Sequence, residues 1–341
     1  MIYLLRVLFV FVFVAVPFVA VGQDADVGAD VGSDAEAKEL SLQWPLECTV
    51  FEDCFIKHYP DLRAGTNRAV PVDYKCGRRT VPGLAGTTIV FQDHSTTRNQ
   101  PVLAMAAGRV MFIRDDLSGN RRYPIQSRKA CGNYVQVRHS STHSTKYCHL
   151  RQGTVGVEVG ERVEAGAQLG QVGSSGAAEH PQLQVKVLEN GNPVDPFTGR
   201  DVSSPSECFS AADEQMWAQD IPYPDAGVMS ASFTLGAPPS NDIAFNATPT
   251  EVLPAEVSPI SVWIRVYGVK KGDREQIVIK TPDGEAWHEH KRYHPVSANF
   301  WTAMTTVRPT APLEPGTWQA VYTLQRAGDV VVEHTFEVEV N

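Results

Sequence analysis

Positive charge is scarce in this sequence, in which 30 Lys and Arg residues stand against 39 Asp and Glu residues to give a net charge of −9. Binding to nucleic-acid phosphates requires a basic face, so the charge balance argues against a nucleic-acid partner. Part of the acidic excess lies in residues 23–43, where Asp, Ala, Val and Gly alternate without a hydrophobic period. We interpret this stretch as a flexible acidic linker that precedes the folded part of the chain.

Cys-x-x-Cys spacing is also absent, which argues against a structural zinc site. No cysteine closely follows the apolar N-terminal run, so the sequence shows no lipid-attachment site. The six cysteines are Cys48, Cys54, Cys76, Cys131, Cys148 and Cys208. An even number of cysteines in an exported chain predicts disulfides, although six cysteines allow 15 pairings and the sequence does not choose among them.

The N-terminal residues predict export. One cation, Arg6, precedes most of a long apolar run, and the small residues Ala20 and Gly22 lie just before Gln23. This is the pattern of a secretory signal peptide over residues 1–22, and it predicts no stable membrane span after cleavage. A retained membrane anchor is the alternative, because the run approaches the ~20 residues that span a bilayer.

Long stretches with a helical period are missing, and short strand patterns separated by turn signals take their place. In the segment Tyr134–Arg138, Val135 and Val137 share one face while polar residues share the other, as in a half-buried antiparallel strand. After His149, the valines at 155, 157, 159 and 163 are followed by glycines that recur at a spacing typical of turns, so this region is predicted to be part of a folded antiparallel sheet. The sequence therefore predicts an all-β protein with a glycine-rich antiparallel β-core over residues 44–222.

Residues 223–341 predict a second β domain. Ser261–Tyr267 and Gln276–Lys280 alternate in polarity, Asp283-Gly284 supplies one hairpin turn and Gly328-Asp329 supplies another. Several short strands at this spacing are typical of a β-sandwich of immunoglobulin-like size. The Cys…Trp…Cys pattern of true immunoglobulin domains is missing, so the domain is expected to be immunoglobulin-like in architecture only.

Five short motifs follow one another between Gly83 and Phe197. They are Pro101-Val102-Leu103-Ala104 with Gly108-Arg109-Val110, Cys131-Gly132-Asn133-Tyr134-Val135 leading to His139, Tyr147-Cys148-His149-Leu150, the glycine run from Val159 to Gly173, and Asn190-Gly191-Asn192-Pro193-Val194-Asp195-Pro196. In this order they resemble the lysostaphin/LytM family of zinc metalloendopeptidases, which cut peptide cross-bridges in bacterial peptidoglycan. The resemblance implies the family's β-core, a duplicated hybrid motif, with a groove across one face.

The resemblance also implies where zinc ligands would lie. In the family, zinc is held by the His and Asp of an H-x-x-x-D element and by the second His of an H-x-H element, which leaves a position open for water and substrate. Here the first element falls on Leu84 and Thr88, and the second on Gln182 and Gln184. Leucine has no donor atom, threonine replaces a carboxylate poorly, and Gln amides are weak zinc ligands. Of the two assisting histidines, one corresponds to Gln182 and only His149 remains.

These substitutions predict a degenerate family member that does not hydrolyse peptidoglycan and has neither a metal site nor a cofactor. The groove candidates are His149, Gln182, Gln184 and His180. The expected partner is a peptidoglycan peptide or a cell-wall amidase or other hydrolase, and the expected location is periplasmic or secreted, in the bacterial envelope. The alternative is an active zinc metalloendopeptidase with rearranged ligands, such as His149, His180 and Asp93, in which case zinc would be the cofactor.

Overall fold

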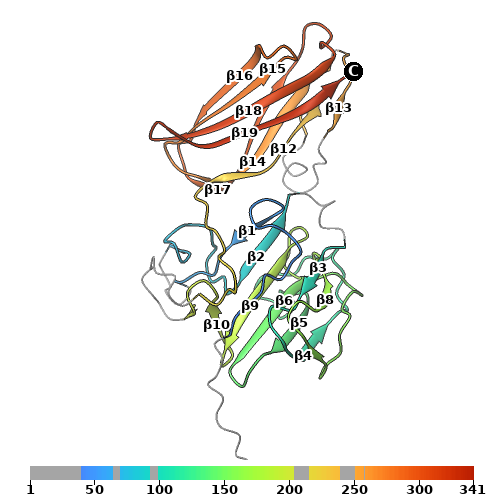
Figure 1. Cartoon of the computed structure of the whole chain (residues 1–341), viewed down its shortest axis with the longest axis vertical. Helices are drawn as coiled ribbons and strands as arrows, with labels where there is room; N and C mark the ends of the chain where they lie inside the picture. The colour runs from blue at the N-terminus through green and yellow to red at the C-terminus, as the bar shows by residue number, and fades with distance from the viewer. Residues whose placement is uncertain (1–39, 64–69, 93–98, 203–214, 239–249, 257) are drawn as a thin grey trace, which may run out of the picture. The chain divides into compact units, whose positions relative to one another are not determined.

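The computed structural model describes residues 40–63, 70–92, 99–202, 215–238, 250–256 and 258–341, and none of these residues is helical (Figure 1). The predicted all-β fold class is therefore confirmed. The predicted signal peptide over residues 1–22 and most of the predicted linker lie outside the described residues. Within the described part of the chain, no helix is long and apolar enough to cross a membrane.

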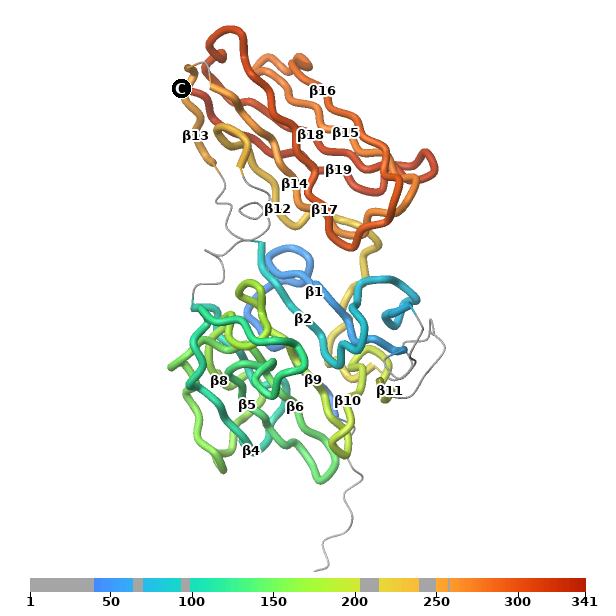
Figure 2. The backbone as a smooth tube through the Cα atoms, turned by 180° about the vertical axis from the view of Figure 1, so that it is seen from behind, coloured from blue at the N-terminus to red at the C-terminus, as the bar shows by residue number. Residues whose placement is uncertain are grey.

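A nine-stranded sheet forms the first half of the fold, with the strand order β1-β2-β9-β6-β5-β4-β7, while β10 pairs with β9 and β11 with β10. Figure 2 shows this sheet from behind. The strands are β1 Cys54–His58, β2 Thr87–Phe91, β4 Gly108–Arg114, β5 Asn133–Arg138, β6 His143–Leu150, β7 Arg162–Val163, β9 Leu183–Glu189, β10 Asn192–Asp195 and β11 Arg200–Asp201. Strands β3, Pro101–Leu103, and β8, Gln168–Gln171, form a separate two-stranded sheet.

Alternation along the central strands decides which face of the large sheet is buried. Val135 and Val137 of β5 are fully buried, as are Val185 and Val187 of β9, whereas the residues between them are only partly covered. Burying each valine stabilises the fold by roughly 1.5–3 kcal/mol. The opposite face keeps the polar residues of the same strands, and it is this face that carries the candidate site.

The valine-rich stretch after His149 differs from the predicted sheet. Val155, Val157 and Val159 lie in irregular chain, and pairing resumes only at β7. The side chain of Asp115 accepts hydrogen bonds from the backbone N–H groups of Gly153 (2.8 Å) and Val155 (3.3 Å). Because these donors are already used, the segment does not need a neighbouring strand to satisfy them.

Two further sheets form from residue 227 onward and share one apolar core. One has the order β12-β14-β17 and the other β13-β19-β18-β15-β16. Their strands are β12 Gly227–Leu235, β13 Val252–Leu253, β14 Ile260–Val269, β15 Arg274–Lys280, β16 Ala286–Tyr293, β17 Ala298–Val307, β18 Gly316–Arg326 and β19 Asp329–Val340. The predicted strands and both hairpins are present, whereas the immunoglobulin-like likeness and the domain boundary at residue 223 stay predictions.

Disulfides join Cys48 to Cys54 and Cys131 to Cys148. Cys76 is also disulfide-bonded, and Cys208 lies outside the described residues. No cysteine of the described ranges is free. The predicted use of cysteine in disulfides is confirmed, and the structure supplies pairings that the sequence left open.

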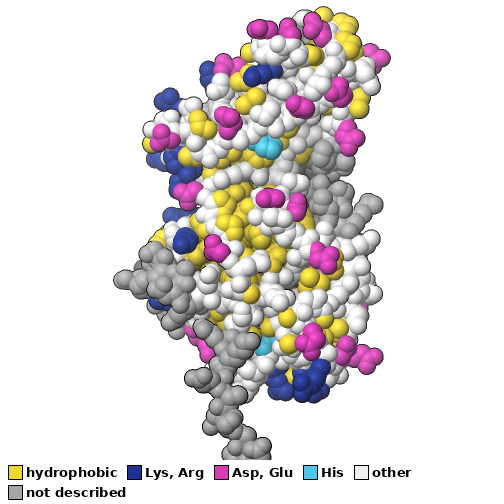
Figure 3. Space-filling view, in the orientation of Figure 1, with side chains coloured by type: hydrophobic (Ala, Val, Ile, Leu, Met, Phe, Trp, Pro, Cys, Tyr) yellow, Lys and Arg dark blue, Asp and Glu magenta, His cyan; other side chains and the backbone are white. Residues whose placement is uncertain are grey.

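On the face drawn in Figure 3, acidic side chains are spread over the surface without one dominant cluster.

Candidate functional site

One row of residues crosses the polar face of the large sheet from strand to strand. Thr88 of β2 pairs with His58 of β1 on one side and with Gln184 of β9 on the other. Gln184 in turn pairs with Cys148 of β6, and Cys148 with Tyr134 of β5. Directly opposed residues on neighbouring strands lie about 4.5–5.5 Å apart. The register therefore brings Thr88 and Gln184, almost 100 positions apart in the sequence, into one cluster.

A groove of about 400 Å³ opens over this row. Its lining includes every position that corresponds to a functional residue of the LytM-type family, namely Leu84, Thr88, His149, Gln182 and Gln184. These five positions come from three separate parts of the chain, and all five line this groove. The correspondence of these residues to the functional positions of the family rests on the alignment of sequence motifs, and it stays a prediction.

Leu84 is held over the groove by a pinned loop. The buried carboxylate of Asp61 accepts a hydrogen bond from the Gly83 N–H (2.9 Å), and the Asp61 N–H donates to the Leu84 carbonyl (2.7 Å). Gly83 has φ +73°, which favours glycine. At Gly86 a Cβ would lie 2.6 Å from the Val185 carbonyl oxygen, so only glycine lets this loop approach β9 so closely.

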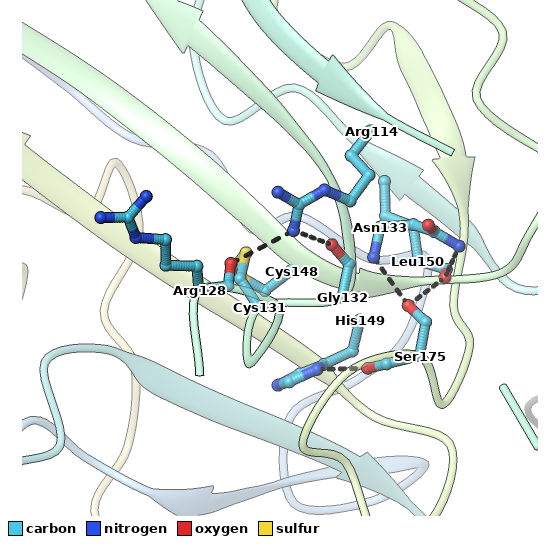
Figure 4. Close-up of a disulfide and its surroundings, with 9 residues drawn as sticks. All are labelled: Arg114, Arg128, Cys131, Gly132, Asn133, Cys148, His149, Leu150 and Ser175. Atoms are coloured by element: carbon cyan, nitrogen blue, oxygen red, sulfur yellow. Dashed lines mark hydrogen bonds between the residues drawn. A yellow bond between two sulfur atoms is a disulfide. The ribbon is translucent and has the colours of Figure 1, made fainter. Parts of the chain in front are cut away.

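His149 is buried and fixed in one orientation, as Figure 4 shows. Its N–H donates to the Cys131 carbonyl (2.8 Å), and its ring Nδ1 lies 2.8 Å from the Ser175 carbonyl oxygen. A carbonyl oxygen only accepts, so Nδ1 carries the proton and Nε2 of the neutral ring carries a lone pair. Burial lowers the pKa of His149 to about 4. At neutral pH the groove therefore contains an uncharged hydrogen-bond acceptor.

A buried polar network supports the Ser175 carbonyl behind His149. The Asn133 N–H donates to Ser175 Oγ (2.8 Å), and that hydroxyl donates to the Leu150 carbonyl (2.7 Å), as drawn in Figure 4. At Gly132, with φ +67°, a Cβ would lie 2.5 Å from the Ser175 carbonyl oxygen, so the two backbones meet only because this residue is glycine. The geometry of His149 is thus built into the core of the domain.

The charged residues of the groove are mainly cations. Lys57, Lys186 and Arg122 line it, with Glu179 as the one carboxylate among its described lining residues. Arg122 and Glu179 pair with each other at 2.6 Å. Burial lowers the pKa of Lys57 to about 8, against the opposing effect of Glu179, and burial also lowers the pKa of Lys186. Burial lowers the pKa of His58 to about 3, so this histidine is neutral at pH 7.

His180, the other histidine proposed from the sequence as a groove residue, is buried, but it does not belong to the described lining of the groove. Asp93, the third member of the alternative ligand set, lies outside the described residues. No group of three His, Cys, Asp or Glu side chains able to hold a metal ion occurs in the described part of the chain. The alternative ligand set stays a prediction, because it includes Asp93.

The sequence model of peptidase family M23 matches residues 91–196, which contain β3 to β10 with His149, Gln182 and Gln184. The protein carries a peptidase family M23 domain. The resemblance to LytM-type peptidases drawn from the motifs is thereby confirmed. The match begins three residues after Thr88, so it includes neither Leu84 nor Thr88, and the placement of these two rests on the sheet register and the groove.

Relatives of the M23 domain include two proteins of Vibrio cholerae serotype O1. The peptidoglycan DD-endopeptidase ShyC is 43% identical over 67 residues, which are 20% of this chain and 15% of ShyC. The peptidoglycan DD-endopeptidase ShyB is 29% identical over 103 residues, which are 30% of this chain and 21% of ShyB. The chain thus spans less than a quarter of the length of each of these relatives.

Among solved structures, a zinc-containing peptidase from Vibrio cholerae is similar at 23% identity with a TM-score of 0.29. The similarity covers 46% of this chain and 39% of that protein. The catalytic domain of lysostaphin from Staphylococcus simulans shares 22% identity with a TM-score of 0.26, covering 34% of this chain and 79% of that one.

The prediction that the protein has no cofactor is wrong, because the match of residues 91–196 to peptidase family M23 implies zinc. The groove itself does not fit the metal. Leu84 offers no donor atom, and Thr88, Gln182 and Gln184 offer only neutral hydroxyl or amide groups. Nε2 of His149 is therefore the one strong zinc donor among the aligned positions, whereas a zinc site needs at least three converging ligands. Zinc is the cofactor of the family, whereas the donor set of this groove does not match the ligands that zinc requires.

Sequence reasoning missed the two lysines of the groove. Lys186 had a usable signal, because it lies two residues after Gln184 on a strand and alternation places both on the same face. Lys57 had none, because its position depends on how β1 pairs with β2, far from the family motifs. The cationic lining is a property of the folded sheet.

His149 is expected to make the stability of the protein depend on pH. Its pKa is about 4 in the folded protein and near 6.5 when unfolded, so the unfolded state binds more protons between these values. Stabilisation from the neutral ring is fully present above pH 6.5 and is lost as pH falls through 4. Between pH 7 and pH 5 this one group should lower the free energy of unfolding by about 2 kcal/mol.

The variant His149→Asn tests this pH effect. Asparagine tolerates the positive φ of 71° at this position and keeps an N–H donor for the Ser175 carbonyl, but it does not titrate. Chemical denaturation of both proteins at pH 7 and pH 5 should show a smaller loss of stability in the variant by about 2 kcal/mol. His58, whose pKa is also lowered, is common to both proteins and cancels in the comparison. Equal losses in the two proteins would contradict the assignment.

Proposed function

We propose that this protein is an exported M23-domain protein of the bacterial cell envelope that binds peptidoglycan peptides in its groove without cleaving them. The observation that carries the proposal is the groove lining. All the positions aligned with functional residues of the family lie around one cavity, yet only His149 has the residue type that the peptidase mechanism needs. The relatives named peptidoglycan DD-endopeptidases support the class of ligand.

The polar character of the groove supports binding. Gln182 and Gln184 each present an amide that both donates and accepts, Thr88 presents a hydroxyl, and His149 presents an acceptor. Peptide backbones offer both N–H groups and carbonyl oxygens, which such a lining can match. Histidine-to-glutamine replacement preserves size and hydrogen bonding, so the groove keeps its shape for a peptide while losing strong metal ligands.

Regulation of a cell-wall hydrolase is the second form of this proposal. A groove that binds without cutting is suited to present peptidoglycan to a partner enzyme, or to bind that enzyme itself. No contact within the described residues favours the partner over the peptide, so the peptide is the ligand to test first. An active zinc endopeptidase with rearranged ligands is the competing activity, and the same experiment decides against one of the two.

The test incubates the protein, without its predicted signal peptide, with purified peptidoglycan sacculi in the presence and absence of added zinc. We expect the protein to sediment with the sacculi and to release no soluble fragments under either condition. Gln184→Trp fills the groove and should reduce binding about tenfold or more. Gln319→Trp, on the outward face of β18, is the control and should bind normally. Fragment release that a chelator abolishes would overturn the proposal in favour of the peptidase.

A further inference from the structure

Neither lysine of the groove forms a salt bridge with a carboxylate of the described residues. Lys57 and Lys186 are both partly buried, and no Asp or Glu oxygen of the described residues lies within 4.0 Å of either amine. Glu179, the one acidic residue of the described lining, is occupied by Arg122 at 2.6 Å. Among the described lining residues, three cations and one carboxylate give two positive charges in excess, in a protein whose net charge is −9.

A third lysine adds to this unbalanced charge. Lys146 of β6 lies directly opposite Lys186 of β9 in the sheet register. Like charges in this arrangement are destabilising. The ammonium of Lys146 lies 3.9 Å from the ring centroid of Tyr134, which offsets part of its cost through a cation–π contact. Lys186 has no such contact among the described residues, so its charge faces the groove uncompensated.

An anionic ligand removes this imbalance. Partly buried ammonium groups lose hydration, and an anion that enters the groove restores a favourable interaction to both. The neutral groups around the lysines fit a peptide attached to that anion, because Gln182, Gln184 and Thr88 donate hydrogen bonds and Nε2 of His149 accepts one. In a peptide the anion is a carboxylate.

We propose that the groove recognises free carboxylate groups of peptidoglycan peptides through Lys57 and Lys186, and so selects peptides whose carboxyl groups are not blocked. This inference deepens the proposed function and rests on it. The ammonium groups supply the affinity for the carboxylate, and the amides and His149 orient the backbone next to it. The preferred ligand is therefore a peptide with free, negatively charged carboxylates. A cross-linked or amidated peptide has fewer such carboxylates.

The experiment compares two forms of one probe. Soluble peptidoglycan fragments are released from sacculi with a muramidase, and half of them are amidated at their carboxyl groups with carbodiimide and ammonia. Calorimetry with the wild-type protein should show that untreated fragments bind about tenfold more tightly than amidated ones. This comparison uses only the wild-type protein, so it does not depend on whether any variant folds.

Four variants locate the effect. Lys57→Met and Lys186→Met should each remove most of the preference for untreated fragments, whereas Lys186→Arg should keep it because the charge remains. Lys271→Met, at an exposed site in the turn before β15, is the matched control and should bind like the wild type. Circular dichroism and thermal melts show whether each variant is folded.

The outcomes separate the two proposals. Equal binding of both fragment forms to the wild type, with loss of binding in Gln184→Trp, overturns the carboxylate inference and leaves peptide binding in place. If both methionine variants still prefer the untreated fragments, the carboxylate inference is also overturned, because residues other than Lys57 and Lys186 would then bind the carboxylates. No binding of either form, with folded protein, overturns the proposed function and this inference together.

Discussion

The combined variant Leu84→His, Thr88→Asp, Gln182→His and Gln184→His is expected to bind zinc on the order of a thousandfold more tightly than the wild-type protein. The expectation follows from the sheet register. Thr88 and Gln184 are directly opposite each other on β2 and β9, so a carboxylate and an imidazole at these positions point into the same part of the groove. Leu84 lines the same groove from a loop that Asp61 and Gly86 hold in place.

The measurement is a zinc titration by calorimetry or by competition with a chelating dye. The control variant Leu84→His with Gln182→His restores only one ligand position and one assisting position, so it should gain little affinity, because a stable site needs three converging ligands. If the four-residue variant folds but binds zinc no better than this control, the placement of the family's ligand positions on these residues is wrong. The result is independent of whether the wild-type groove binds peptides.

How far the sequence predicted this site is clearest from His149 and Thr88. The Tyr-x-His-Leu motif around His149 identified it as a groove residue, because a short motif within one strand carries its local geometry with it. The hydrogen bond to Ser175 and the resulting tautomer were not predictable, since Ser175 lies 26 positions away and reaches His149 only through the backbone approach of Gly132. Nor could the pairing of Thr88 with Gln184 be predicted, because it depends on the strand register of the folded sheet.

The fold was predicted best where periodicity is strong. Strands β5, β9 and β15 have the alternation that the sequence shows, because one face of each is buried. Strand β14 is also present, but it is buried on both faces over most of its length. The valines at 155, 157 and 159 alternate equally well and form no strand, since Asp115 satisfies backbone donors in that segment. Alternation of apolar and polar residues indicates which side chains are buried. It does not indicate which groups accept the hydrogen bonds of the backbone N–H groups.

Removal of the Cys131–Cys148 disulfide by replacing both cysteines with alanine is expected to lower the free energy of unfolding by about 3 kcal/mol. The bond closes a loop across 17 positions, and the loss of this constraint raises the entropy of the unfolded chain. Cys148 is fully buried between Gln184 and Tyr134 in the row that underlies the groove, so alanine also leaves the site less well packed.

The other described disulfide is the natural control. Cys48 and Cys54 are only six positions apart, so the same replacement there should cost about 2 kcal/mol, and neither residue lines the groove. Denaturation with guanidinium, followed by tryptophan fluorescence, measures both losses under non-reducing conditions. A loss below about 1 kcal/mol for the Cys131 and Cys148 pair would contradict the chain-entropy argument.

The two disulfides are expected to differ more in their effect on binding than in their effect on stability. The Cys131 carbonyl accepts the hydrogen bond that holds the backbone of His149, and Cys131 itself lines the groove. We therefore expect the Cys131→Ala, Cys148→Ala variant to lose binding to sacculi at temperatures where it is still folded, and the Cys48→Ala, Cys54→Ala variant to retain it. The same binding in both folded variants would mean that the position of His149 is set by Ser175 and Gly132 alone, without the disulfide.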